Sequence, residues 1–391
     1  MTAVLHDVRV LELSLFSPDA LGGHLADLGA EVIKIEQPGG GGFRGELFPP
    51  DNVQNLQWNR GKKSITLNLK SDKGAAIFRR LAVQANVVID GLRAGAAERL
   101  GLGYDDVVEL NPTIVYCSLN GMGGYGPYAK LPTHGLSFDC FAGLNPPVIQ
   151  PDGTPRLAAG ATGTTGVLAG PLYAAMAVLA ALHSARRDGQ SQYVEVSQVD
   201  AAIAWNFQKL TALANGLFGY SDGMQASLRY QYYETSDGNY VVFNALEDKF
   251  WRRFCEAVNR TDLYEPGQAR LGDDPQADER LRGELTAIFK GRTRSEWTDF
   301  FMATDIAGAP AFEGADLLDD EHVKARGMVY EPCGQDRPPL RLIATPVKTR
   351  PRRPFAAPLP PDVGTHTREV LTTLAGCDEA ELLQLRRDGV I

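Results

Sequence analysis

This sequence lacks the patterns that indicate a metal site, a set of disulfide bonds or a nucleic-acid partner. Its 391 residues include five cysteines, which are widely scattered and form no C-x-x-C pair. This pattern argues against both a disulfide framework and a zinc site. The net charge is −9 at pH 7, without a long run of like charge, whereas nucleic-acid binders usually carry a basic face. We therefore expect no metal site and no nucleic-acid partner.

Long hydrophobic runs are also lacking. The longest apolar stretch, near residues 166–182, is interrupted by Gly170 and Pro171 and falls short of the roughly 20 apolar residues that a membrane span needs. The N-terminal residues MTAVLHDVRVLEL contain no positive segment followed by a long apolar run, so the sequence predicts no signal peptide. These absences favour a cytoplasmic protein with no membrane partner.

What the sequence does contain is an alternation of predicted strands and helices. Helices at 21–28, 74–84 and 94–101 are predicted to connect strands at 8–13, 31–35, 65–69, 87–89 and 113–118. Alternating strands and helices indicate a parallel sheet with helices on both faces. The predicted fold class is therefore α/β, with a Rossmann-like doubly wound large domain.

The character of the sequence changes near residue 225. The segment YYETSDGNYVVF places Asp237 and Gly238 at a predicted hairpin turn, and three helices are predicted between 248 and 303. The predicted parts are a large Rossmann-like domain in 1–200, a smaller α+β domain in 225–330, and a proline-rich return strap with a C-terminal helix in 335–391 that joins the large domain.

Several segments have residue types suited to ligand binding. The glycines of GMGGYGPY, at 121–128, follow a predicted strand, where they let a backbone approach a ligand, although the residues alone favour a tight turn. Basic residues gather in NRGKKSITLNLK, at 59–70, with Arg93 and Arg99 downstream. Such cations bind phosphate groups, but the residues alone favour a solvated face with scattered ion pairs.

Two further residues are candidates for acid–base chemistry. His134 lies in KLPTHGLSFDCFAG and Glu247 in FNALEDKFW, each among apolar neighbours. On spacing alone, the histidine is more often a structural residue, and the glutamate more often caps the helix predicted to begin near Asp248.

A series of longer motifs runs through nearly the whole chain in order. The motifs are VRVLELS, LADLGAEVIKIEQPGGG, NRGKKSITLNLKS, RAGAAERLGLGYDDVVELNPTIVYCSLNGMGGYGPY, LYAAMAVLAALHSARRDGQSQYVEVSQVDAA, TSDGNYVVFNALEDKFW, DVGTHTREVLTTLAG and LQLRRDGVI. This series resembles the class III CoA-transferase superfamily, which includes formyl-CoA and carnitine CoA-transferases and 2-methylacyl-CoA racemases. The sequence is closer to the racemase-like branch.

The resemblance implies an enzyme that acts on acyl-CoA thioesters as an interlocked homodimer. Coenzyme A would then be part of the substrate, and no tightly bound cofactor is expected. The residues that the resemblance assigns to CoA binding are Lys34, Lys70, Arg93, Arg99, Gly121, Gly123 and Gly124.

One departure from the family pattern concerns the transferase nucleophile. Transferases of this family resemble one another in an aspartate at the start of the long helix before the LYAA-type run, whose carboxylate attacks the thioester and forms an anhydride. Here that position falls on Gly166 or Val167, and no acid occurs between Pro155 and Asp188. Ordinary transferase chemistry is therefore not expected.

His134 and Glu247 match the racemase branch instead, where a histidine paired with a glutamate takes or gives the proton beside the thioester carbonyl. The ordinary pKa of histidine suits this role, and backbone N–H groups of Gly121–Gly124 are candidate donors to the enolate oxygen. The aspartate that follows the histidine in that branch is Gly135 here.

Three functions remain open on the sequence. The first is α-proton chemistry, such as racemisation or epimerisation, with His134 and Glu247 as the base. The second is CoA transfer between carboxylates, which would need either another nucleophile such as Asp139 or direct attack by the acceptor carboxylate. The third is a non-catalytic subunit that binds acyl-CoA.

Overall fold

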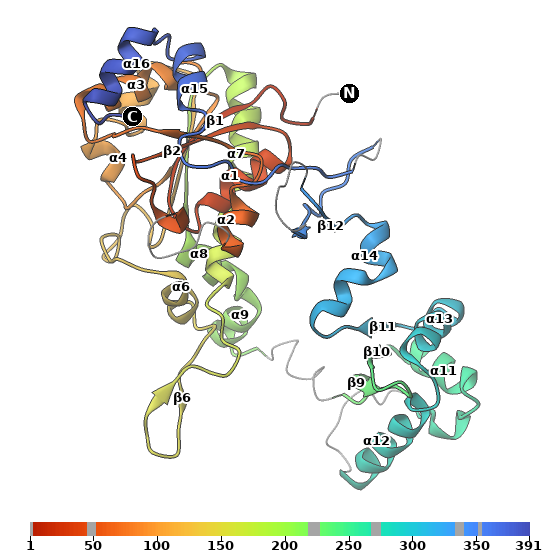
Figure 1. The fold of residues 1–391 in the computed structure, drawn as a ribbon. Coiled ribbons are helices and arrows are strands. Elements are labelled where there is room, and N and C mark those ends of the chain that lie inside the picture. Colours follow the sequence, from red (N-terminus) through yellow and green to blue (C-terminus); the bar gives the residue numbers. More distant parts are fainter. Residues whose placement is uncertain (1–2, 45–51, 218–226, 267–274, 333–339, 351–353) are drawn as a thin grey trace. The chain divides into compact units, whose positions relative to one another are not determined.

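The chain divides into two units in the computed structural model, which describes residues 3–44, 52–217, 227–266, 275–332, 340–350 and 354–391. The large unit comprises Met1–Phe207 and Gly327–Ile391, and the small unit comprises Gln208–Arg326. Figure 1 colours both along the sequence, and the blue C-terminal helices lie on the large unit beside the orange N-terminal ones. The chain thus leaves the large unit once and returns to it.

A six-stranded sheet forms the centre of the large unit, with strands in the order β3-β2-β1-β4-β5-β8. All neighbouring pairs are parallel. The strands are β1 (Arg9–Ser14), β2 (Glu31–Glu36), β3 (Lys63–Thr66), β4 (Val87–Gly91), β5 (Val115–Asn120) and β8 (Gln192–Ser197). Because the order reverses at β1, the sheet is doubly wound like a Rossmann fold, which confirms the predicted fold class.

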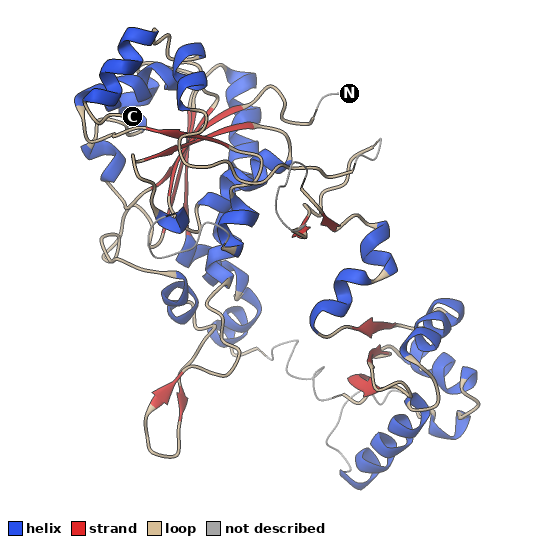
Figure 2. Ribbon diagram, viewed as in Figure 1, coloured by secondary structure: helices blue, strands red, loops and turns tan. Residues whose placement is uncertain are grey.

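Helices cover both faces of this sheet (Figure 2). One apolar core joins Leu11 and Ile33 of the sheet to α3, α15 and α16, and the other joins Val10 and Val32 to α1 and α7. The helices of this unit are α1 (Asp19–Asp27), α2 (Val53–Trp58), α3 (Asp72–Ala82), α4 (Ala96–Arg99), α5 (Tyr104–Val108), α6 (Gly135–Phe141), α7 (Thr165–Asp188), α8 (Gln198–Trp205), α15 (Thr367–Thr373) and α16 (Glu379–Arg387). A short hairpin, β6 (Val148–Ile149) with β7 (Pro155–Arg156), extends between α6 and α7.

Helix α7 is long and apolar enough, by length and composition, to cross a membrane, but half of its most apolar window is buried inside the structure. Ala174, Val178 and Ala181 of this helix pack against the sheet. Its packing is that of a core helix. Two helices follow β8, namely α8 and α9 (Phe207–Asn215), and they are separated at Asn206. The Asn206 side chain donates a hydrogen bond to the Ala142 carbonyl oxygen at 2.9 Å, which fixes this break.

The small unit is an antiparallel sheet packed against helices around an aromatic core. The strands are β9 (Tyr230–Glu234), β10 (Tyr240–Asn244) and β11 (Gly308–Ala311), in the order β11-β10-β9. The helices are α11 (Asp248–Ala257), α12 (Pro275–Phe289), α13 (Arg294–Thr304) and α14 (Glu321–Ala325). Phe243, Phe254, Phe289 and Trp297 are fully or almost fully buried in its centre. The predicted hairpin turn at Asp237 and Gly238 does connect β9 and β10.

The return strap packs against the large unit from which the chain departed. After a small hairpin, β12 (Val329–Tyr330) with β13 (Leu342–Ile343), the described residues 354–361 run without helix or strand. Gly61 donates its N–H to the Pro358 carbonyl oxygen at 3.1 Å, and the Arg60 guanidinium lies 4.9 Å from the centre of the Phe355 ring. The strap is therefore held mainly through residues near α2.

Candidate active site

The loops that follow the parallel strands lie at one edge of the large unit's sheet, because parallel strands all end on the same side. In doubly wound folds this edge is where ligands bind. Phe16 follows β1, Lys70 follows β3, Arg93 follows β4, and the glycine loop that leads to His134 follows β5. The predicted site residues of the large unit thus belong to this edge, with the exception of Lys34, which lies within β2.

Lys34 is buried inside the large unit and is only 2% exposed. Its ammonium forms an ion pair with Asp19 and donates to the Ser14 carbonyl oxygen at 3.1 Å. Burial would raise the pKa of the Asp19 carboxyl, but the Lys34 and Lys62 ammoniums lower it below its ordinary value. Since its charge is already neutralised in the interior, Lys34 is a structural residue, and its predicted contact with CoA is not supported by its position.

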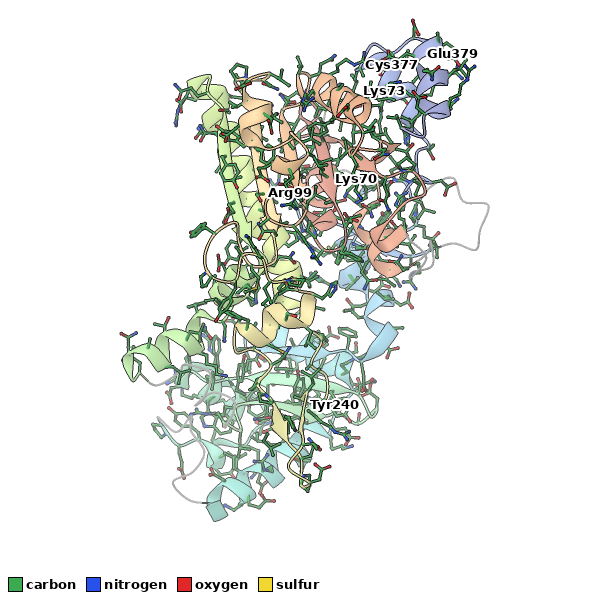
Figure 3. All side chains as sticks on the ribbon, turned by 90° about the vertical axis from the view of Figure 1, so that its left-hand side faces the viewer. Lys70, Lys73, Arg99, Tyr240, Cys377 and Glu379 are labelled. Atoms are coloured by element: carbon green, nitrogen blue, oxygen red, sulfur yellow. The ribbon has the colours of Figure 1, made fainter. Side chains whose placement is uncertain are left out.

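The other predicted cations lie on the surface. Lys70, Arg93 and Arg99 are exposed, and Lys70 and Arg99 are labelled on the large unit in Figure 3. In the described part of the chain no ion pair is recorded for any of the three, whereas the buried Lys62 pairs with Glu12 at 2.7 Å. The three exposed cations therefore have free charge to offer a phosphate group.

The glycine loop after β5 is closed by hydrogen bonds of its own. Gly123 donates its N–H to Asn120 Oδ1 at 2.6 Å, and Gly124 donates to Glu195 Oε1 at 2.9 Å. A Cβ atom at Gly121 would lie 2.3 Å from Thr133 Oγ1, so this glycine allows a close approach of two loop segments. The predicted use of these N–H groups as enolate donors fails for Gly123 and Gly124, because both already have acceptors.

His134 is exposed and immediately precedes α6. Its backbone oxygen accepts the N–H of Ser137 at 2.8 Å. The imidazole lies edge-on to the Phe16 ring, with the ring centres 6.2 Å apart and the planes at 87°. Among the described residues no hydrogen bond to the imidazole nitrogens is recorded, so both nitrogens are open to a ligand.

Glu247 lies in the small unit, immediately before α11. It caps this helix only through its backbone, whose oxygen accepts the N–H groups of Phe250 and Trp251. Its side chain is exposed and makes no capping hydrogen bond. The capping role suggested by the sequence is thus met without the carboxylate. Because His134 and Glu247 belong to different units, their pairing stays a prediction.

The start of α7, where the transferase aspartate is expected, is tightly packed. A Cβ atom at Gly166 would lie 2.7 Å from Phe138 Cβ and 2.8 Å from the Gln198 carbonyl oxygen, which is closer than real Cβ contacts. A Cβ atom at Gly135 would lie 2.7 Å from Val167 Cγ2. The Val167 side chain therefore fills the space beside Gly135, the position at which the resemblance to the racemase branch implies an acid.

Asp139 is the acid next to the tightly packed start of α7, and its role was not evident from the sequence. It is 2% exposed, and its two oxygens accept the N–H groups of Thr165 at 3.0 Å and Gly166 at 2.8 Å. These are N–H groups of the first turn of α7, which have no partner within the helix, and a negative charge is favourable there. Asp139 thus caps α7 and does not present its carboxylate as a nucleophile.

Asp90 is a second buried acid that the sequence did not single out, although it ends the apolar run VVID. It is 5% exposed. Its Oδ1 accepts the Leu92 N–H at 3.0 Å, and its Oδ2 receives only a long hydrogen bond from the Tyr116 hydroxyl at 3.4 Å. Burial raises the pKa of this carboxyl to about 6, which is close to neutral pH.

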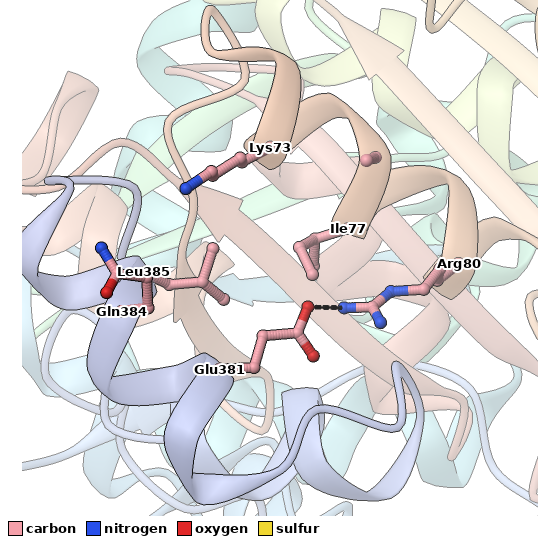
Figure 4. Close-up of a pocket in the computed structure, with 7 residues that line it drawn as sticks. Lys73, Ile77, Arg80, Glu381, Gln384 and Leu385 are labelled. Atoms are coloured by element: carbon pink, nitrogen blue, oxygen red, sulfur yellow. Dashed lines mark hydrogen bonds and ion pairs between the residues drawn. The ribbon is translucent and has the colours of Figure 1, made fainter.

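Figure 4 shows a groove of about 370 Å³ between α3 and α16. Its charged side chains are paired internally, since Arg80 lies 2.8 Å from Glu381 and Lys73 pairs with Asp388. The lining residues are Lys73, Ala76, Ile77, Arg80, Glu381, Gln384 and Leu385. None of the residues predicted for catalysis or CoA binding lines this groove. No cluster of three potential metal ligands occurs among the residues that the structure describes.

Comparison with known proteins decides the family. The profile of CoA-transferase family III matches residues 5–367. The chain belongs to this family. The expectation from the sequence motifs is thereby confirmed, and the fold agrees with solved members. A crystal structure of Rv3272 from Mycobacterium tuberculosis superposes with a TM-score of 0.76 at 28% identity, covering 94% of this chain and 99% of that one.

Curated relatives of this family member have two kinds of activity in their names. Human alpha-methylacyl-CoA racemase is 27% identical over 99% of this chain and 97% of its own. The succinyl-CoA:mesaconate CoA-transferase of Haloarcula marismortui is 30% identical over 96% of this chain and 97% of its own. The prediction of an enzyme of the racemase and CoA-transferase class agrees with both. The choice between the two activities depends on the catalytic residues of the site.

Proposed function

We propose that this family III member catalyses proton transfer at the α-carbon of an acyl-CoA thioester, as a racemase or epimerase. The observation that carries the proposal is the contrast between the two catalytic positions of the family. His134 is exposed with free nitrogens, whereas the transferase position at Gly166 has no room for a side chain and Val167 is apolar. His134 is therefore available as a base, whereas neither Gly166 nor Val167 can form an anhydride.

The chemistry follows from the residues present. The imidazole of His134 takes the α-proton, so a C–H bond breaks, an N–H bond forms, and an enolate remains on the thioester. Glu247 holds the imidazole in the right tautomer and stabilises its protonated form. Since Gly135 and Val167 provide no acid, inversion requires that water return the proton from the opposite face.

The exposed cations Lys70, Arg93 and Arg99 bind the phosphate groups of the CoA moiety. Their free charges at the carboxyl edge of the sheet support this assignment, and Lys34 is left out because it is buried in an ion pair. Replacing Arg93 by Gln should raise KM for the thioester with little change in kcat, because the CoA group is bound equally in the ground and transition states.

A second copy of the chain is proposed as the partner. Apolar side chains recur on the exposed face of α7 at Leu168, Leu172 and Met176, which are 51–61% exposed. This spacing of four residues forms one stripe on the helix, and exposed apolar stripes of this kind mark interaction surfaces. Sedimentation equilibrium should give a dimer, and Met176→Glu should weaken it.

The test of the proposed reaction is exchange of the α-proton in D₂O, followed by mass spectrometry of 2-methylbutyryl-CoA. His134→Ala should reduce the exchange rate by about 10²- to 10⁴-fold, the usual contribution of a general base. His183→Ala is the matched control, because His183 is an exposed histidine near the far end of α7. Exchange by His134→Ala within severalfold of the parent rate would refute the proposed base.

CoA transfer is the second candidate, because relatives at 30% identity have transferase names. It would require direct attack by the acceptor carboxylate or a nucleophile other than Asp139, whose two oxygens accept backbone N–H groups of α7. Appearance of succinyl-CoA from 2-methylbutyryl-CoA and free succinate would support it. A protein that binds acyl-CoA but neither exchanges nor transfers would be a non-catalytic subunit.

A further inference from the structure

Phe16 has a backbone conformation that phenylalanine rarely adopts. Its φ angle is +65°, in the left-handed region, where the Cβ of a bulky residue is crowded by its own backbone. Two other non-glycine residues in the described part of the chain have positive φ, Asn259 and Asp305. Those two end helices α11 and α13, where left-handed residues are common, but Phe16 lies between a strand and a helix and has no such explanation.

The loop that contains Phe16 is held rigidly on both sides. The Ser14 hydroxyl donates to Asp19 Oδ1 at 2.6 Å, and the Ser17 hydroxyl donates to Gln198 Oε1 at 2.7 Å; all four side chains are buried. The Asp19 N–H also donates to the Phe16 carbonyl oxygen at 3.0 Å. A strained conformation persists only where its surroundings determine it in this way, and such positions cluster at functional sites.

The Phe16 ring is aimed at the imidazole of His134. The two rings meet edge to face, 6.2 Å apart, within the range at which aromatic pairs stabilise a fixed orientation. Since no hydrogen bond to the imidazole nitrogens is recorded among the described residues, the large unit orients this histidine through the ring contact. A right-handed backbone at Phe16 would send the ring in another direction.

We infer that Phe16 is a positioning residue, which sets the plane of the His134 imidazole for attack on the α-proton. This inference rests on the proposed function, because it assigns Phe16 a role toward the proposed base. Lys34, which pairs with Asp19 and donates to the Ser14 carbonyl oxygen, then connects the two ends of the loop and keeps the strained backbone in place.

The experiment compares Phe16→Gly, which removes the ring and tolerates the backbone, with Phe16→Tyr, which keeps the ring. The first readout is NMR of ¹³C-labelled histidine. The chain has six histidines, so the His134 ring signal is assigned by its loss in His134→Gln. Its ring-current shift should disappear in Phe16→Gly and persist in Phe16→Tyr. An unchanged His134 signal in Phe16→Gly would overturn the inference.

The second readout is α-proton exchange of 2-methylbutyryl-CoA in D₂O across pH 5 to 9. Phe16→Gly should exchange at least tenfold more slowly through a lower kcat, with an altered pH profile, and Phe16→Tyr should stay within threefold of the parent. Asn259→Gly is the matched control, since it relieves a positive φ without touching His134, and it should leave exchange unchanged.

The two readouts separate the possible failures. Loss of the ring-current shift with undiminished exchange in Phe16→Gly would show that orientation by Phe16 does not serve catalysis, and would overturn the inference alone. Full exchange in His134→Gln would overturn the proposed base as well. If the parent protein did not exchange, the proposed function would fail, and the inferred catalytic role of Phe16 would fail with it.

Discussion

The start of α7 and the loop around His134 belong to neighbouring parts of the large unit but are built in opposite ways. At the start of α7, Gly166 is closely packed, Val167 covers Gly135, and Asp139 accepts two backbone N–H groups. At His134 the imidazole is exposed with free nitrogens, beside the strained backbone of Phe16. The start of α7 has the properties of a stable, packed structural element, and the loop around His134 has those of a reactive site.

Asp90 and Asp139, two of the buried acids of the large unit, provide the largest expected difference in stability. Asp139 has two short hydrogen bonds from backbone N–H groups, whereas Asp90 has one, and its pKa is raised by burial from 3.8 to about 6. An acid with a raised folded-state pKa binds its proton more tightly when folded. Its contribution to stability is therefore present below about pH 4 and is lost as the pH rises through about 6.

Asp90→Asn tests this expectation, because Asn keeps the acceptor for the Leu92 N–H and has no charge. The free energy of unfolding of the parent should fall by about 2 kcal/mol, relative to the variant, between pH 4 and pH 7. Urea denaturation at several pH values measures it. Equal pH dependence in both proteins would show that Asp90 is not the cause.

Asp139→Ala removes the polar contacts at the start of α7. Two buried N–H groups at the start of α7 would lose their acceptor, so the free energy of unfolding should fall by about 2 kcal/mol. Asp378→Ala is the control, because Asp378 caps α16 in an exposed position where water can replace it, and about 1 kcal/mol is expected there. An Asp139 variant as stable as the parent would contradict the capping role.

Gly166→Ala disturbs the close packing at the same place. The new methyl group would meet Phe138 Cβ and the Gln198 carbonyl oxygen at less than 3 Å, so a loss of about 1–2 kcal/mol is expected from overpacking. Gly283→Ala in α12 has open space around its Cβ and should instead gain about 0.5–1 kcal/mol from helix propensity. Thermal unfolding of the two variants in opposite directions would support the packing account.

Much of the large unit's fold could be predicted, because local patterns encode it. Strands such as Val87–Gly91 are short apolar runs between helical segments, and their alternation determines a parallel sheet. The strand predicted at 65–69 ends earlier, at Thr66, because the backbone of Asn68 bonds to Val390 near the C-terminus. Helix α6 was missed because it has only seven residues and is fixed by its neighbours in space.

The candidate site was less predictable, because partners far apart in the sequence decide which groups are free. Lys34 resembles a surface cation until Asp19 is found beside it. Gly124 resembles a ligand loop until Glu195, 71 residues later, takes its N–H. No local pattern identifies Phe16, since its backbone angle and its contact with His134 exist only in the folded chain.

The central claim, proton transfer without an acylated carboxylate, is tested most directly by one incubation. The protein is mixed with 2-methylbutyryl-CoA and hydroxylamine in D₂O, and both the thioester and the peptides are analysed by mass spectrometry. Deuterium on the α-carbon with no hydroxamate on any acidic residue is the predicted result. A hydroxamate on an aspartate or glutamate, with no deuterium in the thioester, would contradict the account.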